Sequence, residues 1–199
     1  MNTSRSRQFF VLTVALALAA CAGGNAGLNS DMIEKAFGNY GVELLSDGDG
    51  RRVTSLFSEA DGVKTTRTYA VVEFLGETRP AFAREDERIR SGGSIGATFR
   101  DAGWEIRKQH LFIGELEVPA SYWSIAELMN ITLPQTLALD QYLFIVTKDQ
   151  RSYNYAMITE LHHPAYLNLA DLQRLYGEIL FDDSNRDSIH DFLGAPPVK

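Results

Sequence analysis

Alternating apolar and polar positions along the chain predict a sheet whose strands are joined by tight turns. The clearest turn is Asp61-Gly62, a dipeptide typical of a two-residue hairpin because both positions accept the left-handed backbone conformation. A second turn is expected at residues 47–50, Asp-Gly-Asp-Gly. The predicted strands cover residues 42–45, 53–57, 64–74, 104–118, 139–147 and 153–161. They form sets of hairpin-linked neighbours, which is typical of antiparallel sheets.

Helical periodicity occupies the intervals between these sets. Helices are expected at 31–37 and in one long segment from Pro80 to about Asp101. Residues 124–127, Ser-Ile-Ala-Glu, match a capping box and predict a short helix. Asn168 is predicted to cap the last helix. The apolar residues that share one face of that helix are Leu169, Leu172, Tyr176, Ile179 and Leu180.

This order of elements predicts an α+β fold with a mainly antiparallel sheet and helices packed on one of its faces. A weak internal duplication is one interpretation of two similar segments. Tyr69-Ala70-Val71-Val72 leads to Pro80 and a helix, and Tyr155-Ala156-Met157-Ile158 leads to Pro164 and a helix. Two unrelated strands that each end before a proline are the other interpretation. Under duplication, two similar halves would flank a central groove.

Composition limits the classes of function. The chain has 199 residues, one cysteine and a formal net charge of −7. The length indicates one domain, or one domain with a short appendage. A single cysteine excludes an intrachain disulfide and a zinc site built from several thiolates. The acidic balance argues against nucleic acid as a partner, because a nucleic-acid binder needs a basic face.

The N-terminal segment has the pattern of an exported protein. Arg5 and Arg7 stand in a start that carries no acid, and an apolar run follows from Phe9 to Ala20. This run is too short to span a membrane as a helix and is typical of a secretory signal. The tetrapeptide Leu18-Ala19-Ala20-Cys21 resembles the bacterial lipoprotein signal, the lipobox. Ordinary secretory cleavage that leaves a free thiol on Cys21 is the alternative.

The resemblance implies that a peptidase cuts before Cys21 and that the thiol carries a diacylglycerol. A lipid bilayer is then the partner that holds the protein, and several acyl chains on one residue make that attachment stable. Ala22 in place of an aspartate implies the outer membrane of a Gram-negative host, with the domain facing the periplasm. Loss of the two arginines changes the formal net charge from −7 to −9, so anionic headgroups repel the domain itself.

The predicted organisation has four parts. They are a signal peptide at 1–20, a lipidated N-terminus and flexible tether at 21–30, a single α+β domain at 31–193 and a C-terminal tail at 194–199. As a coil, the tether spans about 15–18 Å on average. The domain is therefore expected to stay close to its membrane, and a protein partner is expected to be membrane-proximal.

Ser94 is a candidate ligand-binding residue within Gly92-Gly93-Ser94-Ile95-Gly96. Each glycine inside a helix costs about 1 kcal/mol in propensity, and close packing of the helix against the sheet would explain that cost. The alternative is a helix that begins at Ser94 and presents its backbone amides to an anionic ligand. The segment lacks the ending of a phosphate-binding loop and does not follow a strand.

His110 is a second candidate ligand-binding residue. It is in phase with Ile106, Phe112 and Leu116 along the predicted strand, which predicts a half-buried ring that hydrogen-bonds to a neighbour. Residues 47–49 resemble the start of a calcium loop, but the later ligand positions do not fit, so a hairpin turn is expected there.

His162 is the third candidate ligand-binding residue. It is adjacent to His163 on a strand, where neighbours point to opposite faces, so the two cannot easily bind one ion. A metal at either histidine would need His110, Glu160 or a distant carboxylate as well. Hydrogen-bonded rings are the expectation instead, and neither a metal nor a cofactor is predicted.

These patterns favour a membrane-anchored envelope lipoprotein that acts as a non-catalytic accessory or interaction protein on the periplasmic side of the outer membrane. The residues provide no recognisable catalytic set. One alternative is a periplasmic small-ligand binder or chaperone that uses a groove between sheet and helices. Another is a metal-assisted hydrolase that uses His162 or His163.

Overall fold

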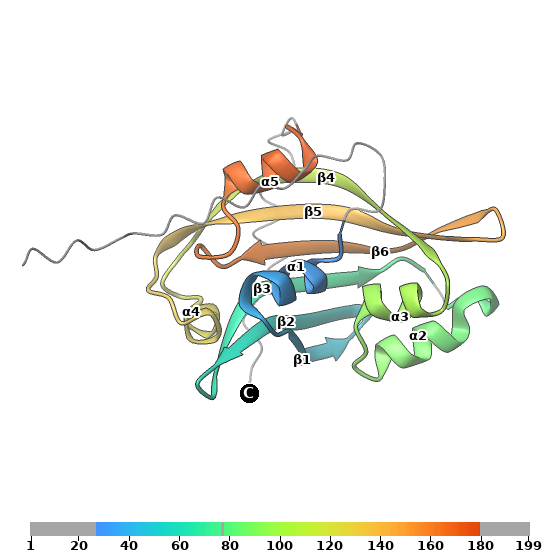
Figure 1. Ribbon diagram of the computed structural model, residues 1–199, viewed down its shortest axis with the longest axis horizontal. Coiled ribbons are helices and arrows are strands. Elements are labelled where there is room, and N and C mark those ends of the chain that lie inside the picture. Colours follow the sequence, from blue (N-terminus) through green and yellow to red (C-terminus); the bar gives the residue numbers. More distant parts are fainter. Residues whose placement is uncertain (1–26, 77, 180–199) are drawn as a thin grey trace, which may run out of the picture.

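The computed structural model describes residues 27–76 and 78–179 and contains one six-stranded antiparallel sheet with helices around it (Figure 1). The strands are β1 (Gly41–Gly48), β2 (Arg51–Ala60), β3 (Val63–Phe74), β4 (Glu105–Val118), β5 (Gln135–Lys148) and β6 (Arg151–His162). The helices are α1 (Asn29–Phe37), the 3-10 turn η1 (Pro80–Phe82), α2 (Ala83–Arg90), α3 (Ile95–Asp101), α4 (Trp123–Met129) and α5 (Leu169–Tyr176). The predicted α+β class is confirmed.

The strand order is β1-β2-β3-β6-β5-β4, so each half of the sheet consists of three consecutive strands and the halves meet at the central pair. That pair is β3 with β6, in a register that runs from Thr68 opposite His162 to Phe74 opposite Ala156. Two similar halves would give this order. The connections differ between the halves, because α4 lies between β4 and β5 and only a tight turn lies between β1 and β2.

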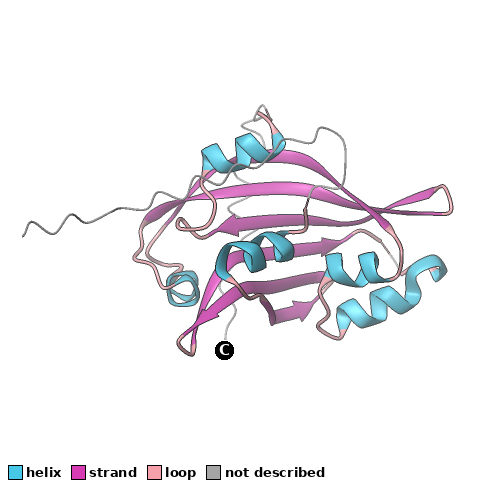
Figure 2. Cartoon of the chain, in the orientation of Figure 1, coloured by secondary structure: helices cyan, strands magenta, loops and turns pink. Residues whose placement is uncertain are grey.

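Figure 2 shows the helices around the sheet, and the core clusters place different helices on its two faces. On the inner face, α2 and α3 pack through Ile89 and Phe99 in a cluster that includes Val72, and α5 packs through Leu172 on Ala138. α1 joins the same face through a hydrogen bond from Asn29 to Thr68.

α4 packs on the outer face. Its Ile125 and Met129 pack in a cluster with Val71, Leu139 and Leu161. The sequence predicts helices on one face of the sheet, and the structure has helices on both faces. β5 and β6 are buried along most of their length, and a strand buried on both sides needs a cover on each.

The long helix predicted from Pro80 to Asp101 is interrupted, and this part of the prediction is wrong. α2 ends at Arg90 and α3 begins at Ile95. Gly92 between them has φ +106°, a left-handed conformation that favours glycine. A Cβ at Gly93 would lie 2.8 Å from the Arg88 carbonyl oxygen, so this tight turn requires a residue without a side chain.

Two other local expectations are corrected. The helix predicted at 31–37 begins at Asn29, inside the range predicted as tether, because Leu28 and Asn29 are buried against the domain. α4 begins at Trp123 and has no side-chain cap, so the capping box predicted at Ser124 does not form. The cap predicted at Asn168 is confirmed, since Asn168 and Asp171 form a reciprocal capping box.

The predicted signal segment, Cys21 and the tail at 194–199 lie outside the described residues. Within residues 27–76 and 78–179, no helix has the length and apolar character needed to cross a membrane.

Candidate functional site

A cluster of polar side chains lies buried in the middle of the inner face. The strand register brings it together, because Asp140 on β5 pairs with Glu160 on β6, and Thr68 on β3 pairs with His162 on β6. All of these side chains are at least nine-tenths buried. This polar cluster consists of Thr68, Lys108, His110, Asp140, Glu160 and His162.

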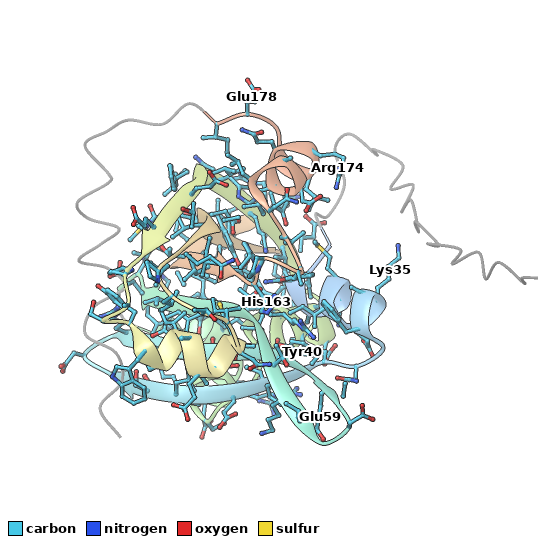
Figure 3. The ribbon with its side chains drawn as sticks, turned by 90° about the vertical axis from the view of Figure 1, so that its left-hand side faces the viewer. Lys35, Tyr40, Glu59, His163, Arg174 and Glu178 are labelled. Carbon is cyan, nitrogen blue, oxygen red and sulfur yellow. The ribbon has the colours of Figure 1, made fainter. Side chains whose placement is uncertain are left out.

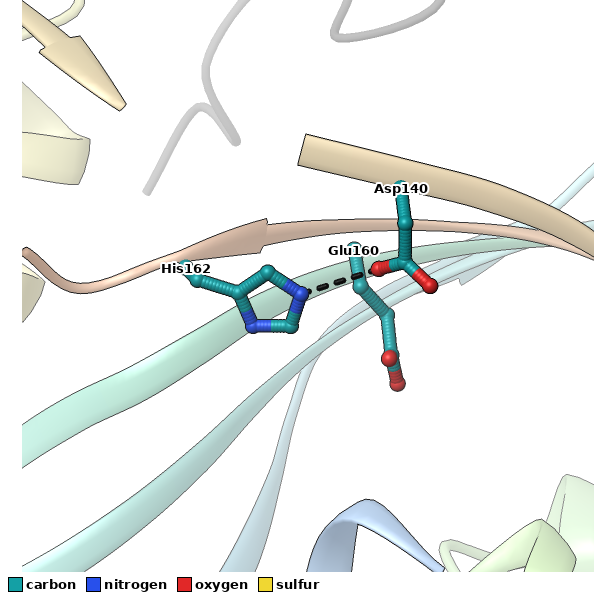
Figure 4. Close-up of side chains that lie close together, drawn as sticks. All are labelled: Asp140, Glu160 and His162. Atoms are coloured by element: carbon teal, nitrogen blue, oxygen red, sulfur yellow. Dashed lines mark hydrogen bonds and ion pairs between the residues drawn. The ribbon is translucent and has the colours of Figure 1, made fainter. Parts of the chain in front are cut away.

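Asp140 and His162 form the best-defined contact of the polar cluster (Figure 4). The His162 Nε2 lies 2.9 Å from the Asp140 Oδ1. An ionised carboxylate can only accept, so the Nε2 carries the proton. On the other side of the ring, the Thr68 hydroxyl lies 3.1 Å from the His162 Nδ1 and accepts a hydrogen bond from the Asn29 amide at 3.0 Å. The ring orientation is therefore fixed from both sides.

His110 approaches the second oxygen of the same carboxylate. Its Nδ1 lies 3.2 Å from the Asp140 Oδ2, although the alignment falls short of a hydrogen bond for either atom. The ring stacks on Tyr176 of α5, with centroids 4.0 Å apart. Burial alone would raise the pKa of the Asp140 carboxyl, but its contacts with His110 and His162 and the charge of Lys108 hold that pKa well below its usual range.

Lys108 and Glu160 form a buried ion pair beside these histidines. The Lys108 Nζ lies 3.7 Å from the Glu160 Oε2 and 4.2 Å from the centre of the Tyr142 ring. Burial would lower the pKa of the lysine ammonium, but the charge of Glu160 raises it well above its usual range, so Lys108 is a cation. The Nζ has no hydrogen-bond partner in the described residues. An ammonium has three donors, and leaving them unmade in a buried site is costly.

A pocket of about 70 Å³ opens between the sheet and the segment that joins α2 to α3. Lys108 and Glu160 line it together with Arg52 of β2. Most of the remaining wall is apolar and includes Val72 and Ile158. The pocket therefore combines an apolar surface with a small number of buried charges, as small-molecule sites do.

Arg52 holds one wall of the pocket in place. Its Nη1 donates to the carbonyl oxygens of Ile89 at 2.5 Å and Gly93 at 3.1 Å. These carbonyls lie at the break between α2 and α3, where the helical hydrogen-bond ladder stops. The buried guanidinium thus finds acceptors in carbonyl oxygens that the break in the helix leaves without an α-helical partner.

Ser94 lines the same pocket and hydrogen-bonds to the Tyr40 hydroxyl. α3 begins directly after Ser94, but the serine side chain does not cap the helix. Residues 92–96 also match the Gly-x-Ser-x-Gly pattern of hydrolase nucleophile elbows. Such an elbow needs a strand that leads into a helix, whereas here α2 precedes the turn. The serine therefore contributes to the pocket wall and has none of the geometry of a nucleophile.

The three candidates from the sequence do not meet at one point. His110 and His162 share the Asp140 carboxylate, whereas Ser94 lies in the pocket wall. A β-bulge between His110 and Phe112 changes the phase of β4, so Phe112 and Leu116 pack in the outer cluster. The expectation that His110 shares their face is wrong for this reason.

His163 does not join the polar cluster, as expected for a neighbour of His162 on a strand. Its Nδ1 accepts a hydrogen bond from the Ala165 backbone amide at 2.9 Å. Burial lowers the pKa of this imidazole. Figure 3 shows His163 within the body of the protein, whereas Lys35 and Arg174 project outward.

Two residues that organise the site, Asp140 and Lys108, were not identified from the sequence. Asp140 lies in the apolar run Leu137-Ala138-Leu139-Asp140, where a carboxylate needs a specific partner if it is buried. A charge inside a run that predicts a buried strand is the signal that could have revealed the polar cluster. The partners themselves come from other strands, and no local pattern identifies them.

Comparison with known proteins does not assign the chain to a family. No protein-family model matches it, and no curated protein matches it. Among solved structures, the crystal structure of the PhnF C-terminal domain is similar, with a TM-score of 0.40 and 15% identity over 66% of this chain and 72% of that one. A likeness of this size supports no statement about binding or activity.

Proposed function

We propose that this chain is a lipid-anchored, non-catalytic envelope protein whose domain binds a small carboxylate in the pocket lined by Lys108. The observation that carries the binding proposal is the Lys108 Nζ, a buried cation at the pocket that has no hydrogen-bond partner in the described residues. A ligand carboxylate would accept from this ammonium in a charge-assisted hydrogen bond.

The charges and size of the pocket define the ligand. Arg52 and Lys108 carry two positive charges against the single negative charge of Glu160 among the lining residues. The Asp140 carboxylate behind Lys108 adds a further negative charge, so the pocket favours a ligand with a single negative charge over a dianion. The volume of about 70 Å³ is well below the roughly 300–1,000 Å³ of sites for drug-sized molecules. The apolar wall favours a ligand with a short hydrocarbon chain. A short-chain monocarboxylate meets these three conditions.

Calorimetric titration of the full chain with acetate, propionate and butyrate tests this proposal. We expect saturable binding that strengthens about fourfold with each methylene, because a buried methylene contributes about 0.8 kcal/mol. Lys108→Met should abolish binding. Lys64→Met is the matched control, since Lys64 lies on the surface and pairs with Glu43.

Two outcomes would contradict the binding proposal. One is the absence of saturable binding by the folded full chain, and the other is equal binding by the parent chain and Lys108→Met. Ala70→Leu provides a second variant that keeps Lys108, because Ala70 lines the pocket and a larger side chain there occupies its volume. This variant should weaken butyrate more than acetate.

The anchor is proposed from the resemblance of Leu18-Ala19-Ala20-Cys21 to the lipobox. Metabolic labelling with a radioactive fatty acid should place the label on the protein, and Cys21→Ser should remove it. Mass spectrometry of native protein should find acyl chains on Cys21. A bare thiol at Cys21 would refute the anchor and leave the pocket proposal standing, since the two depend on different residues.

A further inference from the structure

We infer that Asp140, Glu160 and His162 form a binding site for a divalent transition-metal ion of the zinc class. One ligand atom from each residue can be chosen so that all three lie within 4.8 Å of one another (Figure 4). The three residues come from adjacent strands and are all buried. Imidazole and carboxylate ligands together suit zinc and its neighbours in the first transition row.

The site contains buried polar atoms that lie close to each other without forming a well-aligned hydrogen bond. The Asp140 Oδ2 has no hydrogen-bond partner within the described residues, although Asp140 is 1% exposed. Both ring nitrogens of His110 are also without such a partner. Buried polar atoms are nearly always paired, so these unpaired atoms around one carboxylate point to a missing ligand.

The three ligand atoms lie near the spacing that a metal ion requires. Ligand atoms around a tetrahedral zinc ion lie about 3.3 Å apart, given metal–ligand distances of about 2.0–2.1 Å. The His162 Nε2 and the Asp140 Oδ1 are 2.9 Å apart and share a proton. A metal ion replaces that proton, and the ring then carries its proton on the Nδ1, which faces the Thr68 hydroxyl. The Glu160 carboxylate has to move toward these two atoms. Among the described residues, the contact that holds it back is the ion pair with the Lys108 ammonium at 3.7 Å. His110, whose Nδ1 lies 3.2 Å from the Asp140 Oδ2, is placed to supply a fourth ligand.

Lys108 competes with the metal for Glu160. The two carboxylates and the lysine give this group a net charge of −1, and a divalent ion changes it to +1 while Lys108 remains. Removal of the lysine charge should therefore strengthen metal binding. In the proposed pocket the same change should abolish carboxylate binding. Lys108→Met should thus strengthen zinc binding and abolish carboxylate binding. Because the two effects are opposite, failure of the metal site can be told apart from failure of the proposed function.

Titration with Zn²⁺ alone tests the inference, using the full chain with Cys21→Ser so that its single thiol cannot bind the metal. We expect one zinc ion per chain, displaced by a chelator. Asp140→Asn and His162→Ala should each weaken binding about 100-fold or more, because even outer partners of a metal site contribute 10–100-fold. His163→Ala is the matched control and should bind zinc like the parent. Lys108→Met should bind it more tightly.

Nuclear magnetic resonance of the histidine ring nitrogens in the parent chain keeps the test independent of how the variants fold. Zinc should shift the His162 ring signals and leave those of His163 unchanged. The inference is overturned if 1 to 2 equivalents of Zn²⁺ shift no signal of His162. It is equally overturned if a folded His162→Ala chain binds zinc as tightly as the parent.

Discussion

The buried pair of Lys108 and Glu160 gives the most specific prediction about stability. Their side chains are 3% and 7% exposed, and the Nζ and Oε2 are 3.7 Å apart. Glu160→Gln leaves the lysine charge buried without its partner. Breaking a buried pair in this way costs about 3–5 kcal/mol, which lowers the melting temperature of a chain of this size by roughly 6–20 °C.

The double variant Glu160→Gln/Lys108→Met separates the charge from the packing. It removes both charges, so it should be more stable than Glu160→Gln alone, even though it carries one more substitution. Urea unfolding in the presence of a chelator, followed by tryptophan fluorescence, measures the free energy of unfolding of each variant.

An exposed pair provides the control. Lys64 and Glu43 lie 3.5 Å apart, but their side chains are about half exposed, so Glu43→Gln should change the free energy of unfolding by less than about 1 kcal/mol. Equal losses of unfolding free energy in Glu160→Gln and Glu43→Gln would show that the buried pair does not stabilise the fold. The prediction is also refuted if the double variant loses the sum of the two single effects, since the charges would then not interact.

Three further predictions follow from other parts of the molecule. The pKa of Asp140 is held below its usual range. Its contribution to stability is therefore present above the ordinary pKa of about 3.9 and is lost as the pH falls through the lower folded-state value. A plot of unfolding free energy against pH should be flatter below pH 4 in Asp140→Asn than in the parent, and equal slopes would contradict this prediction. Phe99 is fully buried among aromatic rings that include Phe82 and Tyr155, so Phe99→Ala should lose about 3–5 kcal/mol in urea unfolding, and a loss below 1 kcal/mol would show that the ring does not pack as described. Gly93→Ala should lower the melting temperature, because a Cβ there meets the Arg88 carbonyl at 2.8 Å, whereas Gly48→Ala meets nothing within 4 Å and should not.

Much of the fold could be predicted because its signals are local. The Asp61-Gly62 turn has positive φ at both residues, and this dipeptide indicates a hairpin without reference to the rest of the chain. The cap at Asn168 depends on residues three apart. Hairpins and caps of this kind are sufficient to predict an antiparallel α+β fold.

The break in the helix after Arg90 could not be predicted with the same security. Gly92 and Gly93 fit both a helix that approaches a neighbour closely and a turn between two helices. The turn is favoured by the side chain of Arg52, which takes the carbonyl oxygens of Ile89 and Gly93. Arg52 lies on β2, about forty residues earlier in the chain, so the deciding contact is non-local.

The candidate site depends on non-local pairing to a greater extent. Thr68 meets His162 because β3 pairs with β6 across 94 residues. The bulge after His110 moves Phe112 and Leu116 to the outer face and leaves His110 on the inner one. A single inserted position of this kind leaves no periodic signal in the sequence. His110 and His162 could thus be identified as polar residues in strands, but the shared Asp140 could not.

The proposed function requires that the buried ammonium of Lys108 binds the carboxylate of a small ligand. Nuclear magnetic resonance of ¹⁵N-labelled lysine side chains during a butyrate titration tests it most directly, with the Lys108 signal assigned by its loss in Lys108→Met. We expect a saturable shift of the Lys108 Nζ signal and no shift for Lys64. Butyrate that moves neither signal, or both equally, would contradict the proposal.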